Sequence, residues 1–122
     1  MRRLRIVVLT PDAERFRGAL TSAAAQAALG GEVAILLQQD AVALLARGVD
    51  AAPSDARHAA AGLPTLPALL DEALGLGVAV TACQSGLTLT GITADTLDRR
   101  IEIGGPVSFL QKMTDADRLL LV

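Results

Sequence analysis

The chain of 122 residues contains a single cysteine, Cys83, at a position suited to nucleophilic chemistry. An apolar, β-branched run at 78–81 precedes it, and the residues that follow predict the start of a helix. A thiol at such a junction faces backbone N–H groups and the positive end of the helix dipole, both of which favour the reactive thiolate. Cys83 is therefore the first candidate for covalent chemistry.

The residues directly after Cys83 predict how a thiolate would be stabilised. The backbone amides of Gln84, Ser85 and Gly86 are expected to form a small anion-binding nest around the sulfur. A thiolate held there can accept a sulfur atom, exchange disulfides or be oxidised to a sulfenic acid. The opposite interpretation stays open, because an unpaired cysteine is often a small buried hydrophobe with a structural role only.

A cysteine–histidine pair or a dithiol mechanism finds little support in the sequence. The chain has no second cysteine to resolve a disulfide, and its only histidine, His58, lies in an irregular segment at 47–62. If that segment folded over the carboxyl edge of the sheet, Arg57 or His58 would approach Cys83, and the histidine would help to deprotonate the thiol. A solvated loop histidine is the simpler expectation, since no motif ties His58 to Cys83.

Three further polar residues follow predicted strands and are candidates to surround the thiol. Thr10, Asp12 and Asp40 come just after two apolar runs, and ligands collect outside the carboxyl ends of parallel strands. Asp12 and Asp40 are most simply helix caps. The chain has no Gly-Lys-Ser/Thr or glycine-rich nucleotide motif, and its one Cys, one His and dispersed carboxylates give no metal-ligand spacing. The sequence predicts neither a cofactor nor a metal site.

Strand and helix signals alternate along the chain, without tandem hairpins, repeats or low-complexity tracts. That alternation joins parallel strands through helices. Asp12 is expected to cap the first helix, Gly30 and Gly31 to end it, and Ser54 to cap one or two turns within the irregular segment. We therefore predict a single domain over residues 1–122, a three-layer α/β/α sandwich with a five-stranded, mainly parallel sheet. The expected strands are 4–9, 33–37, 78–81, 99–103 and 118–122, and the expected helices are 13–29, 41–46, 66–74, 86–91, 93–97 and 106–113.

Composition narrows the classes of function. The formal net charge is −2, the basic residues are scattered, and Phe16 and Phe109 are the only aromatic residues, so nucleic-acid binding is not expected. No apolar run approaches the ~20 residues of a membrane span or the length of a signal-peptide core, and one unpaired cysteine favours the cytoplasm. Because 52% of the residues are hydrophobic, one copy is expected to leave apolar surface exposed, which predicts a homo-oligomer.

The residues around Cys83 resemble the signature of the DsrE/DsrF-like family. A glycine and an apolar strand lead to Cys83, a small polar residue follows it, and the pair Gly91–Ile92 comes next. The rest of the chain matches more loosely. The looser matches are the step from Gly30 to Val33, the amphipathic piece at 95–97, the strand and glycine turn at 101–105, and Ala116–Asp117 before the apolar run 119–122.

This resemblance implies a fold, an assembly and an activity. The implied fold is a small α/β/α domain, and the implied assembly is a trimer or a hexamer. The best-understood members of the family carry sulfur as a persulfide on that cysteine, within relays that serve sulfur oxidation or tRNA thiolation. By the same resemblance the sulfur-accepting residue here is Cys83, without a cofactor, and the implied partners are sulfur donor and acceptor proteins.

The leading hypothesis is a cytoplasmic sulfur carrier that holds a persulfide on Cys83 and relays it to an acceptor thiol. The residues leave open whether this activity makes the chain an enzyme, a sulfurtransferase that works with a single cysteine. One alternative is a non-enzymatic homo-oligomeric binding or assembly module in which Cys83 is only packed. A thiol redox sensor is the other alternative.

Overall fold

The protein folds around one all-parallel sheet of five strands, in the order β4-β3-β2-β1-β5. The computed structural model describes residues 1–46 and 53–122. Both the predicted α/β class and the predicted number of strands are confirmed. The strands are β1 (Leu4–Val8), β2 (Val33–Leu37), β3 (Ala79–Cys83), β4 (Glu102–Gly104) and β5 (Arg118–Leu121).

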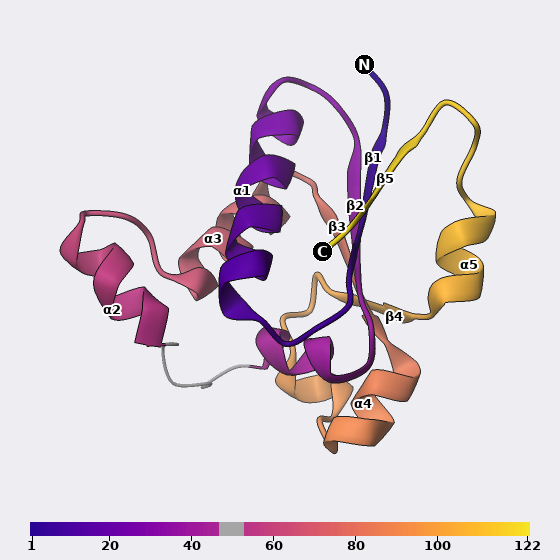
Figure 1. Cartoon of the computed structure of the whole chain (residues 1–122). Coiled ribbons are helices and arrows are strands. Elements are labelled where there is room, and N and C mark those ends of the chain that lie inside the picture. Colours follow the sequence, from indigo (N-terminus) through magenta and orange to yellow (C-terminus); the bar gives the residue numbers. More distant parts are fainter. Residues whose placement is uncertain (47–52) are drawn as a thin grey trace.

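The direction of each connection decides which face of the sheet a helix covers. Crossovers between parallel strands are right-handed, so connections that advance in one direction place their helices on one face. The steps from β1 to β2 and from β2 to β3 carry α1 (Ala13–Ala28) and α3 (Leu66–Gly75), which lie on the same side of the sheet (Figure 1). The step from β4 back to β5 carries α5 (Pro106–Gln111), which covers the opposite face (Figure 1).

Local signals start and stop the two longer helices. The Asp12 side chain accepts a hydrogen bond from the backbone N–H of Arg15 at 3.1 Å, so the predicted cap of α1 is confirmed. Thr65 caps α3 in the same way, accepting from the N–H of Ala68 at 3.3 Å. Gly30, shortly after α1, has a φ of +88°, a left-handed conformation that favours glycine.

The core lies mainly between the sheet and α1. Side chains alternate between the two faces of a strand, and Ile6 lines the side of the sheet that meets Ala19 of α1. Ile6 is fully buried, as are Phe16 and Leu20 of α1. The opposite face carries Arg5, whose guanidinium lies 5.2 Å from the centre of the Phe109 ring on α5.

Several predicted elements have different bounds in the structure. The helix expected at 41–46 is the 3₁₀ segment η1 (Gln39–Leu45), and the strand expected from 99 begins only at Glu102. The helices expected at 86–91 and 93–97 are the helix α4 (Gln84–Thr90) and the 3₁₀ segment η2 (Ala94–Thr96). Cys83 is the last residue of β3, whereas the prediction ended that strand at residue 81.

The segment 47–62, expected to be irregular, contains the helix α2 (Pro53–Ala60). Residues 47–52 of this segment lie outside the described part of the chain. The helix begins at Pro53, so Ser54 lies inside it rather than before it as a cap. A buried ion pair attaches α2 to α1. The Arg17 guanidinium donates to Asp55 and also to the carbonyl of Pro64, and Asp55 accepts a second bond from the N–H of Leu66. Long-range polar contacts of this kind leave no periodic signal in the sequence.

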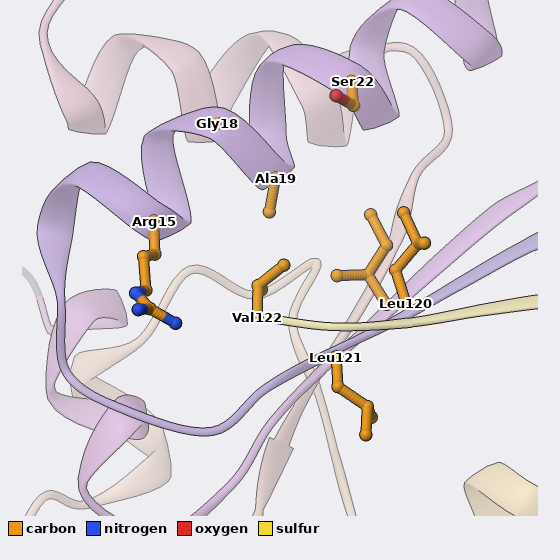
Figure 2. A pocket seen from close by; sticks show the side chains of 8 residues that line it. Arg15, Gly18, Ala19, Ser22, Leu120, Leu121 and Val122 are labelled. Carbon is orange, nitrogen blue, oxygen red and sulfur yellow. The ribbon is translucent and has the colours of Figure 1, made fainter.

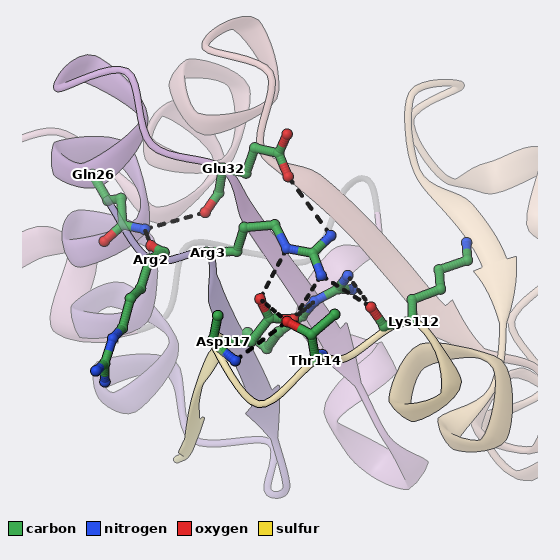
Figure 3. A network of polar contacts seen from close by, with 9 residues as sticks. Arg2, Arg3, Gln26, Glu32, Lys112, Thr114 and Asp117 are labelled. Carbon is green, nitrogen blue, oxygen red and sulfur yellow. Dashed lines mark hydrogen bonds and ion pairs between the residues drawn. The ribbon is translucent and has the colours of Figure 1, made fainter.

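A second polar network holds the edge strand β5 against β1. Arg3 donates from Nε and Nη2 to the two carboxylate oxygens of Asp117, each at 2.9 Å (Figure 3). Thr114 donates its backbone N–H to the same carboxylate at 3.1 Å. Because these bonds favour the ionised form, foremost those from Arg3, the pKa of Asp117 lies below its ordinary value.

We expect this network to make stability depend on acidity. A carboxylate with a lowered pKa stabilises the folded state fully above its unfolded pKa of about 3.9, and this stabilisation is lost as the pH falls through the folded value. Asp117→Asn removes the charge and should lower the urea midpoint at pH 7. Between pH 5 and pH 3 the midpoint of the variant should fall less steeply than that of the wild type, and parallel curves would contradict this role.

Candidate functional site

Cys83 lies at the carboxyl edge of the sheet, between the end of β3 and the start of α4. It pairs in register with Gly104, the last residue of β4. Only 2% of Cys83 is exposed, yet it lines a cavity of about 370 Å³. The other lining residues come from α4, from the end of β4 and the residue after it, and from α5. They are Gln84, Ser85, Gly104, Gly105, Pro106, Val107, Ser108 and Gln111.

Hydrogen-bond donors around the thiol oppose the effect of its burial. Burial raises the pKa of Cys83, because an apolar environment disfavours the thiolate. Against this, the Ser85 hydroxyl, whose Oγ lies 2.9 Å from Sγ, lowers the pKa. The backbone N–H groups of Gly86, Gln39 and Ser85 lower it further. The pKa of Cys83 lies below its ordinary value as a result, which increases the thiolate fraction at neutral pH.

Two of the three amides predicted to form a nest around the sulfur, those of Ser85 and Gly86, lie beside it. The structure places the amides of Ser85 and Gly86 against the sulfur, whereas Gln84 is exposed and lines the cavity. The Ser85 hydroxyl adds a side-chain contact that the amide argument did not include.

Gln39 is the part of the site that sequence reasoning missed. It begins η1 with a φ of 53°, a left-handed conformation that is uncommon outside glycine. A Cβ added to Gly86 would lie 2.5 Å from the Gln39 carbonyl oxygen and 2.6 Å from Cγ2 of Val42. The absence of a side chain at Gly86 therefore lets η1 approach α4 closely enough for the Gln39 N–H to reach the thiol. A glycine three residues after the cysteine was the only signal in the sequence for this approach.

The structure brings the other predicted residues to the carboxyl edge without joining them to the thiol. Thr10 and Asp12 lie in the exposed connection after β1, where Asp12 caps α1. Asp40 lies in the first turn of η1, next to Gln39, and is exposed. Their expected place around Cys83 stays a prediction.

His58 lies away from the site, on α2 at the far side of α1 and α3 from α5 (Figure 1). Its Nδ1 is 3.7 Å from the Glu14 carboxylate, and Nη2 of Arg57 is 3.9 Å from the same group. The expectation of a solvated loop histidine is wrong, because His58 is helical and its side chain is only 14% exposed. The alternative in which 47–62 carries His58 to Cys83 is not the arrangement seen here.

The described residues form neither a metal-binding cluster nor a membrane-spanning helix. Across 1–46 and 53–122, no three His, Cys, Asp or Glu side chains are grouped closely enough to hold a metal ion. Within the same ranges, no helix has the length and apolar character needed to cross a membrane.

Comparisons with known proteins agree with this architecture. The model of the DsrE/DsrF-like family matches residues 3–122. The chain belongs to the DsrE/DsrF-like family. Two solved structures share its fold over 100% of both chains. They are the YchN protein from E. coli (20% identity, TM-score 0.76) and MTH1491, a protein of unknown function from Methanobacterium thermoautotrophicum (15% identity, TM-score 0.76).

These comparisons confirm the family resemblance seen in the sequence. At 15–20% identity, the two structures support the fold alone. A comparison with curated protein sequences gives no match. What Cys83 does in this member of the family has to be argued from its own surroundings.

The Ser85 hydroxyl provides a direct test of those surroundings. Ser85→Ala removes a donor to the thiolate, so the pKa of Cys83 should rise and alkylation by iodoacetamide at pH 7 should slow by roughly fivefold, the equivalent of about 1 kcal/mol. The matched control is Ser22→Ala on α1, which should react at the wild-type rate. An unchanged rate in Ser85→Ala would show that the hydroxyl does not stabilise the thiolate.

Proposed function

We propose that this member of the DsrE/DsrF-like family is a sulfur carrier that holds a persulfide on Cys83. The observation that carries the proposal is a thiol with a lowered pKa at the edge of a cavity, supported by the Ser85 hydroxyl and by three backbone amides. The same donors would stabilise the anionic persulfide, because fixed N–H and O–H groups favour negative charge where water is excluded. Family membership supports sulfur relay as the general role.

The proposed chemistry consists of two exchanges at sulfur. In loading, the Cys83 thiolate attacks the outer sulfur of a donor persulfide, the donor S–S bond breaks, and the donor leaves as a thiolate with the electron pair. In delivery, an acceptor thiolate attacks the outer sulfur on Cys83. The S–S bond on Cys83 then breaks and Cys83 leaves as the thiolate. A low pKa makes Cys83 a good leaving group in the second exchange, and the cycle is redox-neutral.

One observation favours a second candidate, an assembly module in which Cys83 only packs. Cys83 is 2% exposed and belongs to the hydrophobic core cluster, as a structural cysteine would. A packed cysteine, however, has no need of the four donors that lower the pKa of this thiol. A redox sensor would use the same activated thiol but would form a sulfenic acid without taking up sulfur.

We also propose that the chain works as a homo-oligomer, a trimer or a hexamer, in the cytoplasm. Support for assembly comes from β5, whose Leu119, Leu120 and Leu121 are 42–62% exposed on an open sheet edge. Leu120, Leu121 and Val122 line a groove against α1, with the Leu121 side chain on the opposite side of the strand from the other two (Figure 2). A second copy would cover these side chains. The cytoplasm fits a carrier whose lone thiol must stay reduced.

Mass spectrometry tests the persulfide directly. After incubation with a small persulfide donor and removal of the excess, the wild type should gain one sulfur atom, and a reductant should remove it. Cys83→Ser should gain none. No gain in the wild type, or an equal gain in Cys83→Ser, would contradict the proposal, and a gain of oxygen alone would favour the sensor.

Light scattering tests the proposed assembly. The wild type should show three or six times the 12.5 kDa mass of one chain. Replacing both Leu119 and Leu121 with Asp places charges in the proposed interface and should lower the mass toward one chain. Leu29→Asp, at a leucine after α1 that is 74% exposed, is the control. A wild type of one-chain mass, or a double variant that assembles like the wild type, would contradict this interface.

A further inference from the structure

A second, smaller cavity lies beside the Cys83 cavity, between the sheet and α5. Its volume is about 130 Å³, the space of about four waters at about 30 Å³ each. Gly104, Gly105 and Ser108 line both cavities, so the two are neighbours across the β4–α5 turn. A small molecule held in this second cavity would lie next to the cavity of the thiol.

Gly104 lines both cavities, and because it has no side chain it leaves space at the boundary between them. A Cβ added there would lie 3.2 Å from Cγ2 of Thr81 and 3.7 Å from Oγ of Ser108. The φ of neighbouring Gly105 is −160°, extended backbone that any residue adopts. A side chain at this turn would therefore fill the space between the cavities without straining the backbone.

The second cavity carries charge of both signs. Arg5 and Lys112 line it, and so does Glu102. Arg5 is only 8% exposed, and its guanidinium is held over the Phe109 ring at 5.2 Å. A buried guanidinium beside a cavity is a strong site for a carboxylate, because charge-assisted hydrogen bonds gain strength away from water.

Asp117 does not neutralise all of the positive charge of Arg3, Arg5 and Lys112. Its carboxylate is held by two 2.9 Å bonds from Arg3, while Nε of Arg5 is 3.8 Å away. Arg3 also lies 3.9 Å from the Glu32 carboxylate, whereas the carboxylate paired with Arg5 is Asp117, which Arg3 already binds. The backbone carbonyl of Lys112 joins this network, accepting from Arg3 at 3.1 Å and from Arg5 at 3.4 Å, while the Lys112 ammonium extends away from Asp117 (Figure 3). Arg5 and Lys112 together leave positive charge for a bound anion.

The charges and the thiol share one face of the sheet. Thr81 pairs in register with Glu102, and Cys83 pairs with Gly104 one full pleat further along. Alternate residues of a strand point to the same face, so Glu102 and Cys83 lie on the same side, about 6.6 Å apart along the strand direction. A ligand with a charged head group and a short thiol arm matches this spacing.

We infer that this cavity binds a small zwitterionic thiol of the amino-acid type, which accepts sulfur from Cys83. Its carboxylate would bind Arg5 and Lys112, and its ammonium would bind Glu102. The inference rests on the proposed function and names the acceptor class. The bound thiolate attacks the outer sulfur of the Cys83 persulfide, a new S–S bond forms on the small thiol, and Cys83 leaves as the thiolate with the electron pair.

Transfer rates to matched small thiols test the acceptor. Protein loaded with sulfur on Cys83 is mixed with L-cysteine, D-cysteine or cysteamine, which lacks the carboxylate. L-cysteine should react about tenfold faster than cysteamine, the factor that one charge-assisted contact of about 1.4 kcal/mol gives, and several-fold faster than its enantiomer. Equal rates for the three thiols would overturn the inference.

Charge variants assign the preference to this cavity. Lys112→Gln and Glu102→Gln change exposed side chains, so folding is not at risk, and each should reduce the preference for L-cysteine over cysteamine severalfold. Arg15→Gln on α1, across the sheet, removes an equal charge and should keep the wild-type preference. An undiminished preference in both cavity variants would overturn the inference.

A non-reacting ligand separates this inference from the proposed function. S-methyl-L-cysteine cannot accept sulfur, so its binding to unloaded protein is measured by NMR. The amides of Gly104 and Ser108 should shift saturably, and Lys112→Gln should weaken the binding. If Cys83 cannot be loaded but the shifts appear, the proposed function fails and the binding site stands. If Cys83 is loaded and no shifts appear, the binding site fails alone.

Discussion

The right-handed connection between parallel strands is the constraint on which the arrangement of this protein depends. Connections that advance from β1 to β3 place α1 and α3 on one face, and the return from β4 to β5 places α5 on the other. Six residues of α5 cannot cover a face of five strands. The partly covered face is where the cavities beside Cys83 and Arg5 lie.

The thiol site depends on a balance between burial and hydrogen bonding. Burial excludes water from Cys83 and by itself would hold the thiol protonated. Donors from two elements reverse that effect: Ser85 and Gly86 of α4, and Gln39 of η1. Because Gly86 lets η1 come close, a single missing side chain couples the packing of two elements to the electrostatics of the sulfur.

Much of the fold could be predicted because it rests on local signals. The apolar runs of β1 and β2, the Asp12 cap and the Gly30 stop are each readable from neighbouring residues. The position of Cys83 at the carboxyl edge followed from the alternation of strands and helices. In the structure Cys83 lies at that edge, as the last residue of β3.

The remaining features depend on contacts between distant segments. The Gln39 amide reaches the thiol through a left-handed backbone at a residue that gives no sign of it. His58 is held near Glu14 because the Arg17–Asp55 pair fixes α2 against α1. The Arg3–Asp117 pair joins residues that lie 114 positions apart. None of these contacts has a periodicity that a single sequence displays.

The central claim, that the fold activates Cys83 as a thiolate, is tested most directly by the pH dependence of its alkylation. Since Cys83 is the only cysteine, every alkylated thiol reports on this residue. The same chain unfolded in urea gives the reference midpoint. The account predicts that the folded protein reacts with a midpoint at lower pH than the unfolded chain. A folded midpoint equal to or above the unfolded one would contradict it.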